Sequence, residues 1–444
     1  MNPFRFLRGP MPLIGAGLAL VVLSGVGYIG LITRSGVGTA GIAALTSLYF
    51  LINTVALGVF SGVEQEMSRT VSQERAVGRL SVPAAHVVAK QAVRLFLFAS
   101  AGVLVLSPVL VKGSFQGHWS LVGELIVGLF ATCCASTVRG ALAGSKRFGF
   151  YAASLATEGL SRLILCTALW LLKVDSVWAF GLAFVLGQLF AALVGAVLFW
   201  LAGDRNRARL TSPGAAEPIA GAGKMRFGIA AGLGLLVIAS LTNQAVVNLP
   251  PVLVAAKLVS QPALSAAIGV ALTLTRLPMF AFVPLQTMLL PRLTETATRG
   301  DRLGVRKQTM RTVAACVVLG LAGILVLATA GPWLLGVYAP KVAGLLSGAT
   351  MAGLGIGTLF LMTANVTQPA LLALGKHRLV LASYLTGAAA MVVAFVLPLD
   401  PVFSAVLTAS VGPIALATVM AVALARATHG ALPPTADAPA PAVH

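Results

Sequence analysis

The stretch FYAASLATEGLSRLILCTALWLL, residues 150 to 172, is long and apolar enough to cross a lipid bilayer, yet it contains Glu158 and Arg162. An α-helix of about 20 apolar residues spans roughly 30 Å of hydrocarbon. A charged side chain at the bilayer centre costs about 2.5 to 3.5 kcal/mol on insertion scales, so such residues usually face a protein interior or a wet cavity. The stretch therefore predicts a membrane-spanning fold with a polar site inside it.

The whole chain has the composition of an integral membrane protein. Hydrophobic residues make up 58% of its 444 residues, charged residues make up 10%, and the mean hydropathy is +0.95. A soluble domain carries about 25% charged residues. Apolar stretches of spanning length recur at about 12–33, 38–62, 86–111, 119–141, 150–172, 177–201, 227–253, 264–291, 311–336, 342–370, 379–398 and 402–425. We therefore expect an all-α membrane protein with about 12 transmembrane helices.

The positive residues indicate the orientation. With the N-terminus in the cytoplasm, the inner segments hold 24 of the 31 Lys and Arg residues, and the outer loops hold five. Cytoplasmic loops retain positive charge, so both termini are expected in the cytoplasm. The net charge of +19 then reflects topology and affinity for the anionic headgroups of membrane lipids. No nucleic-acid partner is expected.

A long polar connection divides the chain into two halves. The expected parts are an N-terminal six-helix lobe at 1–201, a cytoplasmic linker at 202–226, a C-terminal six-helix lobe at 227–425 and a disordered cytoplasmic tail at 426–444. The sequence GSKR at 144–147 is similar to GKHR at 375–378, at an offset of 231. This weak repeat favours a transporter whose parallel halves surround a central cavity.

No motif of a soluble enzyme occurs in the chain. No GxGxxG follows a predicted strand, and GxxxxGK[ST], HExxH and GxSxG are absent. The four cysteines lie inside predicted spans, and the five histidines are scattered without the spacing of a zinc site. We expect no enzymatic activity, no metal and no cofactor.

Two charged sites lie within predicted spans. Glu158 and Arg162 are four residues apart on one helix face and are predicted to pair. The pair has two interpretations: it neutralises itself as a buried link between helices, or it serves a functional site. Arg276 lies in the span 264–291, which contains no carboxylate, and Pro278 follows it. A kink is expected there.

The preceding span presents Asn243 and Gln244. These amides either line the same cavity as Arg276 or hydrogen-bond between helices.

Three stretches resemble a known family: GVFSGVEQEMSRTVSQE at 58–74, GALAGSKRFGFYAASLATEGLSRLIL at 140–165 and MLLPRLTETATRGD at 288–301. They are similar to the polysaccharide or O-antigen flippase branch of the multidrug/oligosaccharidyl-lipid/polysaccharide exporter superfamily. The resemblance implies two lobes around a central cavity in the bacterial cytoplasmic membrane. It also implies movement of a polyprenyl-diphosphate-linked glycan from the inner to the outer leaflet by alternating access.

The resemblance further implies a cationic cavity that holds the diphosphate of the carrier. Arg162 and Arg276 are the expected contacts, Glu158 is expected to orient Arg162, and Arg139 and Arg34 are candidates near the gates. Glycosyltransferases or a polymerase of envelope synthesis are possible partners.

Other classes stay open. A multidrug/cation antiporter of the same superfamily would prefer an acidic, aromatic-lined cavity, whereas two arginines and one glutamate are central here, and the first span lacks an acidic residue. A major-facilitator carrier would show a Gly-Asp-Arg-Gly-Arg type signature where this chain has EQEMSRTVSQERAVGR. A membrane scaffold for envelope polysaccharide synthesis is a further alternative.

Overall fold

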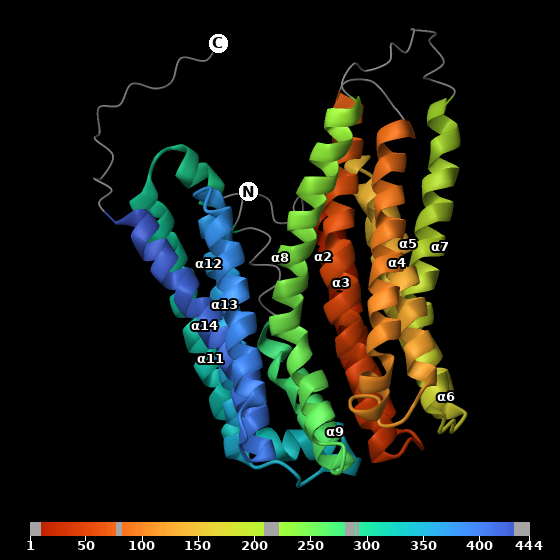
Figure 1. Cartoon of the computed structure of the whole chain (residues 1–444), viewed down its shortest axis with the longest axis vertical. Coiled ribbons are helices and arrows are strands. Elements are labelled where there is room, and N and C mark those ends of the chain that lie inside the picture. The colour runs from red at the N-terminus through yellow and green to blue at the C-terminus, as the bar shows by residue number, and fades with distance from the viewer. Residues whose placement is uncertain (1–9, 77–81, 208–221, 280–288, 290–292, 430–444) are drawn as a thin grey trace. The chain divides into compact units, whose positions relative to one another are not determined.

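The computed structural model describes residues 10–76, 82–207, 222–279, 289 and 293–429. These residues form α-helices, one short 3-10 helix and turns, and no β-strand occurs among them (Figure 1). The elements are α2 (Pro10–Arg34), α3 (Thr39–Ala76), α4 (Val82–Lys112), α5 (Ser120–Gly144), α6 (Phe148–Leu171), α7 (Val177–Arg207), α8 (Ala222–Lys257), α9 (Pro262–Thr275), α11 (Arg302–Tyr338), η1 (Pro340–Val342), α12 (Gly348–Ala373), α13 (His377–Val396) and α14 (Pro401–Thr428).

Twelve helical segments within these ranges are long and apolar enough to cross a membrane. This confirms the prediction of an all-α, multi-pass membrane protein. Helix α3 is longer than the apolar stretch that predicts it, because it continues from residue 62 to Ala76. The added residues include Glu, Gln, Met and Arg, which favour helix even where they are too polar for the bilayer core.

Helix α9 stops inside its predicted span. It ends at Thr275, and Arg276 occupies a turn before a short helical piece. Pro278 lacks an amide hydrogen, and its ring clashes with the carbonyl four residues earlier in a regular helix. The interruption lies where the sequence predicts a kink. The later part of that span, 280–288 and 290–292, lies outside the described residues.

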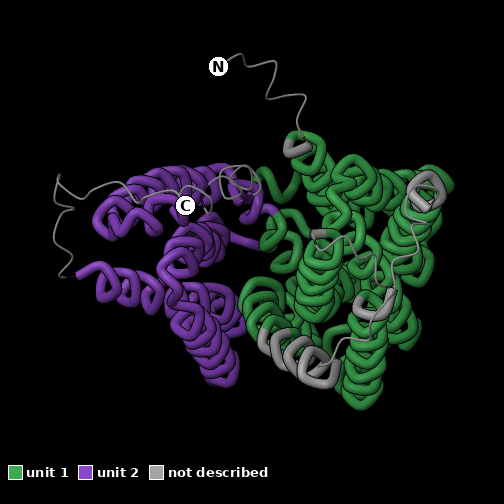
Figure 2. Tube along the Cα trace, turned by 90° about the horizontal axis from the view of Figure 1, so that it is seen from above, with its two compact units in different colours: residues 1–273, 333–345 green, residues 274–332, 346–444 purple. Residues whose placement is uncertain are grey.

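The chain forms two compact units, which Figure 2 shows in green and purple. Unit 1 contains Met1–Thr273 and Trp333–Leu345, and unit 2 contains Leu274–Pro332 and Leu346–His444. Helix α8, which the sequence assigns to the predicted lobe 227–425, packs along α3 within unit 1.

The two connecting segments of the predicted domains are described only in part. Helix α7 continues to Arg207 and α8 begins at Ala222, so both ends of the predicted linker 202–226 are helical. The middle of that linker, 208–221, lies outside the described residues. Helix α14 continues to Thr428, and the rest of the predicted tail lies outside them too. The six-plus-six division and the disorder of the tail stay predictions.

In unit 1, α3 packs against α5 and α8, α2 against α6, and α7 against both α5 and α6. Two glycines bring the ends of α3 and α5 together. A Cβ on Gly140 would lie 2.6 Å from the carbonyl oxygen of Glu64, and a Cβ on Gly144 would lie 2.6 Å from that of Ser68. Small residues four apart allow this close approach between membrane helices.

In unit 2, α14 packs against α12 and α13. Ser410 donates a hydrogen bond to the carbonyl of Gly353 at 3.0 Å, and Thr358 donates one to Thr275 at 3.4 Å. Such bonds between hydroxyls and neighbouring helices are common where no water competes.

Candidate functional site

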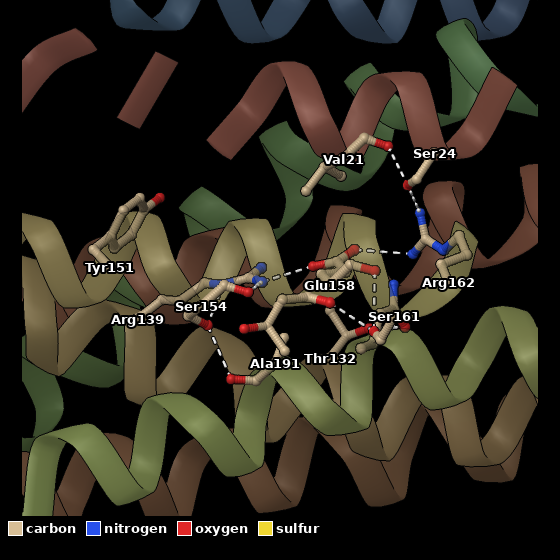
Figure 3. Close-up of polar contacts among 12 residues, drawn as sticks. Val21, Ser24, Thr132, Arg139, Tyr151, Ser154, Glu158, Ser161, Arg162 and Ala191 are labelled. Carbon is tan, nitrogen blue, oxygen red and sulfur yellow. Dashed lines mark hydrogen bonds and ion pairs between the residues drawn. The ribbon is translucent and has the colours of Figure 1, made fainter. Parts of the chain in front are cut away.

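The polar centre of unit 1 is an ion-pair network between α5 and α6. Glu158 accepts from Arg162 at 3.0 Å on its own helix and from Arg139 of α5 at 2.7 Å. Its carboxylate lies between the two guanidinium groups in Figure 3. All three residues are buried, with at most 8% of their surface exposed. The predicted pairing of Glu158 with Arg162 is confirmed, and Arg139 joins it as a second partner.

Arg162 is also held by α2 and α7. Its guanidinium donates to the Ser24 hydroxyl of α2 at 3.0 Å, and its carbon atom Cζ lies 4.1 Å from the centre of the Phe184 ring of α7. A guanidinium over an aromatic face gains an attraction to the ring quadrupole. The Nε of Arg162 is buried and has no hydrogen-bond partner among the residues that the structure describes.

Arg139 is held by contacts with α6, which itself bonds to α7. Its Nε donates to the Ser154 hydroxyl at 3.2 Å, and that hydroxyl donates to the carbonyl of Ala191 on α7 at 2.9 Å (Figure 3). The network therefore joins α2, α5, α6 and α7. The interpretation as a buried link between helices is consistent with these contacts.

The network holds more guanidinium than carboxylate. Among the described residues, Glu158 is the carboxylate that accepts hydrogen bonds from both Arg139 and Arg162. Glu64 lies within electrostatic reach of Arg139 and accepts a hydrogen bond from Tyr151 at 2.7 Å. The two guanidinium groups therefore share one hydrogen-bonding carboxylate, and the oxygens of a further anion can take over part of this bonding.

The structure buries a further carboxylate inside a span, Glu124, which the count of one central glutamate missed. Glu124 of α5 is 3% exposed, and neither of its oxygens has a hydrogen-bond partner among the described residues. A Cβ on Gly181 of α7 would lie 1.6 Å from its Oε2, so only glycine leaves room for the carboxyl group there. The sequence carries the signal, because Glu124 lies five residues inside the predicted span 119–141.

Tyr28 of α2 lies within electrostatic reach of the Glu124 carboxylate, and its hydroxyl is buried with no hydrogen-bond partner among the described residues. The Tyr28 ring centre lies 4.9 Å from that of Phe184 and 6.3 Å from that of Tyr49. A buried acidic group inside a membrane span is typical of sites that take up a proton or a cation.

The other predicted site residues are spread over the two units. Arg276 is 8% exposed and belongs to unit 2. Asn243 and Gln244 lie on α8 in unit 1, both half-buried, and Gln244 accepts from the Asn248 amide at 2.8 Å. This bond lies within one helix.

Arg34 is exposed at the end of α2. It donates to the carbonyl of Val337 at 2.5 Å, and Lys341 donates to the carbonyls of Ser35 and, at 2.6 Å, of Val37. Partial burial lowers the pKa of Lys341. These bonds hold Trp333–Leu345 against the α2–α3 turn, so Arg34 has a structural partner in unit 1.

No group of three His, Cys, Asp or Glu side chains that suits a metal ion occurs among the residues that the structure describes.

Comparison with solved structures shows the fold. The chain superposes on an inward-facing multidrug resistance MATE family transporter of the MOP superfamily with a TM-score of 0.71, over 93% of this chain and 100% of that one, at 13% identity. An outward-facing transporter of that family gives 0.59, over 96% and 99%, at 13% identity. The eukaryotic MATE transporter AtDTX14 gives 0.58, over 95% and 97%, at 12% identity. The fold is that of MATE transporters.

Sequence relatives are found in Mycobacterium tuberculosis. The uncharacterized protein Rv1510 is 27% identical over 432 residues, covering 94% of this chain and 92% of its own. The uncharacterized protein Rv3630 is 26% identical over 443 residues with the same coverage. No protein-family model matches the chain.

Proposed function

We propose that the protein is a transporter that moves a polyprenyl-diphosphate-linked glycan from the inner to the outer leaflet of a bacterial cytoplasmic membrane by alternating access. The fold of the MOP superfamily supports transport. The observation that carries the substrate class is the shared carboxylate, since two buried guanidinium groups compete for Glu158. Both termini are proposed to face the cytoplasm, and glycosyltransferases or a polymerase are proposed partners.

A diphosphate can offer the two guanidinium groups further oxygen atoms that accept hydrogen bonds. Phosphate oxygens accept two parallel hydrogen bonds from one guanidinium, as carboxylates do. An arriving phosphate therefore competes with Glu158 for Arg162, whose Nε–H has no partner within the described ranges. Glu158 then keeps Arg139. Arg162 also donates to Ser24 of α2, so this bond is proposed to open when the phosphate binds.

Arg276 is the proposed phosphate contact of unit 2, and Arg139 is proposed to keep Glu158 in place while the substrate is bound. Arg34 is proposed to act near the outer gate through its bond to Val337. Asn243 and Gln244 are proposed to face the glycan from α8.

The membrane potential supplies the driving force in this proposal. Each elementary charge that crosses the membrane contributes about 2.3 kcal/mol per 100 mV. With a negative cytoplasm, an anionic headgroup moving outward and an emptied cationic site returning inward both run downhill. A dedicated ion site is then not needed.

The experiment is flipping of a fluorescent polyprenyl-diphosphate glycan in proteoliposomes, followed by an impermeant quencher. Arg162→Gln and Arg276→Gln should each abolish flipping while the protein still inserts and elutes as a single species. Collapse of the membrane potential should slow the wild type. Undiminished flipping by both variants would refute the substrate class.

A multidrug/cation antiporter is the second candidate, and Glu124 favours it. A buried carboxyl group that has no hydrogen-bond partner among the described residues, and that lies within electrostatic reach of Tyr28, can exchange a proton for an organic cation. In this case a pH gradient should drive uptake of tetraphenylphosphonium into proteoliposomes, and Glu124→Gln should abolish it. Glycan flipping that survives in Glu124→Gln, without any cation uptake by the wild type, would exclude this candidate.

A further inference from the structure

We propose that unit 1 carries a sugar-binding pocket at the end where α3 terminates and α5 turns into α6. The inference rests on the proposed function for the source of the sugar, which is the glycan of the lipid-linked substrate. The positive-inside pattern predicts that this end faces the cytoplasm, where such a substrate would first meet the protein.

The pocket has a volume of about 450 Å³, within the range of about 300 to 1,000 Å³ that small-molecule sites occupy. All of its walls belong to unit 1. It is lined by Ile14 of α2, by Glu64, Gln65, Ser68, Arg69 and Ser72 of α3, by Ala143 of α5 and by Phe148 and Tyr151 of α6.

The walls of the pocket are held in place by backbone contacts. Gly140 and Gly144 let α5 lie directly against the α3 backbone next to the polar lining. Ser72 donates to the Gly144 carbonyl at 3.3 Å, and Arg75 donates to the Ser145 carbonyl. The polar face of α3 is therefore held beside the first turn of α6, which carries the aromatic residues.

The side chains of the lining match the hydroxyls and the ring face of a sugar. Glu64, Gln65 and two serines provide acceptors and donors within two turns of α3. Phe148 and Tyr151 provide aromatic surface, and the Tyr151 hydroxyl is already bonded to Glu64 at 2.7 Å. Aromatic side chains pack against apolar C–H faces while their neighbours bind the polar edge.

The charges of the pocket argue against a phosphate. Arg69 is the one cation in the lining, and it donates twice to the carboxylate of Glu66, at 3.0 and 2.6 Å. Glu64 adds a second carboxylate to the same end of α3. The one cation of the lining is thus already bound to a carboxylate and Glu64 would repel an anion, whereas an uncharged sugar would meet no repulsion.

The pocket adjoins the ion-pair network. Glu64 belongs to its lining and also lies within electrostatic reach of Arg139. A sugar that bonds to Glu64 or displaces Tyr151 changes the electrostatic surroundings of Arg139, and through it of Glu158. Glycan recognition and diphosphate binding are then two connected parts of unit 1, each with its own residues.

The test measures binding to full-length protein in lipid nanodiscs. The probes are farnesyl diphosphate, farnesyl-diphosphoryl-N-acetylglucosamine, the methyl glycosides of glucose and N-acetylglucosamine, and tetraphenylphosphonium. Ser72→Trp fills the pocket from an exposed position, and Gln73→Trp is the matched control because Gln73 is exposed on the same turn but does not line the pocket. Tyr151→Phe is a second variant that keeps the ring and removes the bond to Glu64.

Wild type should bind the glycosylated diphosphate more tightly than farnesyl diphosphate. Ser72→Trp should weaken the glycosylated probe at least about tenfold, or about 1.4 kcal/mol, and leave farnesyl diphosphate unchanged. Gln73→Trp should change neither affinity, and Tyr151→Phe should weaken the sugar-bearing probes more than farnesyl diphosphate. Unchanged farnesyl diphosphate binding shows that a variant is folded.

Equal binding of both diphosphates to wild type, or no effect of Ser72→Trp, would overturn the pocket. Tetraphenylphosphonium that binds and is blocked by Ser72→Trp, while no glycoside binds, would make it a cation pocket and overturn the inference too. A methyl glycoside that binds in a Ser72-dependent way, while neither diphosphate binds, would uphold the pocket and refute the diphosphate substrate.

Discussion

Replacing Glu158 by Gln should destabilise the protein strongly. The carboxylate accepts from Arg162 at 3.0 Å and from Arg139 at 2.7 Å, and all three groups are buried. Loss of its charge leaves two buried guanidinium groups without the carboxylate that accepts their hydrogen bonds. Removing one partner of a buried ion pair costs about 3 to 5 kcal/mol, and we expect Glu158→Gln to reach at least that range.

The chain offers a matched control on its surface. Glu295 and Arg299 form an exposed pair with the same four-residue spacing and the same order of charges. Exposed helix pairs contribute about 0.3 to 0.5 kcal/mol, so Glu295→Gln should be nearly neutral. Adding Arg139→Met to Glu158→Gln removes one of the two stranded charges and should recover part of the loss.

The assay is unfolding of the purified protein in mixed micelles, with denaturant curves for the three variants and wild type. The expected order of stability is wild type and Glu295→Gln together, then the double variant, then Glu158→Gln. A Glu158→Gln protein within about 1 kcal/mol of wild type, which is the size of an average substitution, would refute the account of the network as a buried, charge-paired centre.

Three further predictions follow from close contacts. Gly144→Ala should separate α3 from α5 and lower the thermal midpoint, because its Cβ would lie 2.6 Å from a backbone oxygen. Gly123→Ala on the same helix meets nothing within 4 Å and should be neutral or slightly stabilising, so equal midpoints of the two variants would contradict this. Gly181→Ala should destabilise the protein by displacing the Glu124 carboxyl, and adding Glu124→Ala should restore most of the midpoint; no rescue would place the carboxyl elsewhere. Lys341→Met should speed hydrogen exchange in residues 339–347 by removing the bonds to the α2–α3 turn, and unchanged exchange would show that these bonds do not hold the segment.

The sequence predicts the helices well because hydropathy measures what the bilayer requires. Each span must be apolar over about 20 residues, and this local property identifies twelve spans without any knowledge of packing. The Glu158–Arg162 pair is predictable for the same reason, since residues four apart meet on any regular helix. Helix ends are less predictable, as α3 shows, because a helix can continue where the apolar stretch stops.

Contacts between helices could not be predicted in this way. Arg139 is placed at a helix end by its sequence position, and only the packing of α5 on α6 brings it to Glu158. The pocket depends equally on the approach of α3 to α5 at Gly140 and Gly144. Glu124 could have been predicted from the sequence, because a charged residue inside an apolar span is a candidate for a functional site, as Glu158 is.

The most direct test of the transport proposal is the leaflet distribution of polyprenyl-diphosphate-linked glycans in cells depleted of this protein, read with an impermeant probe on intact cells and on spheroplasts. The account predicts accumulation on the inner face that wild type reverses and Arg276→Gln does not. An unchanged distribution after depletion would contradict it and favour the cation antiporter or the scaffold.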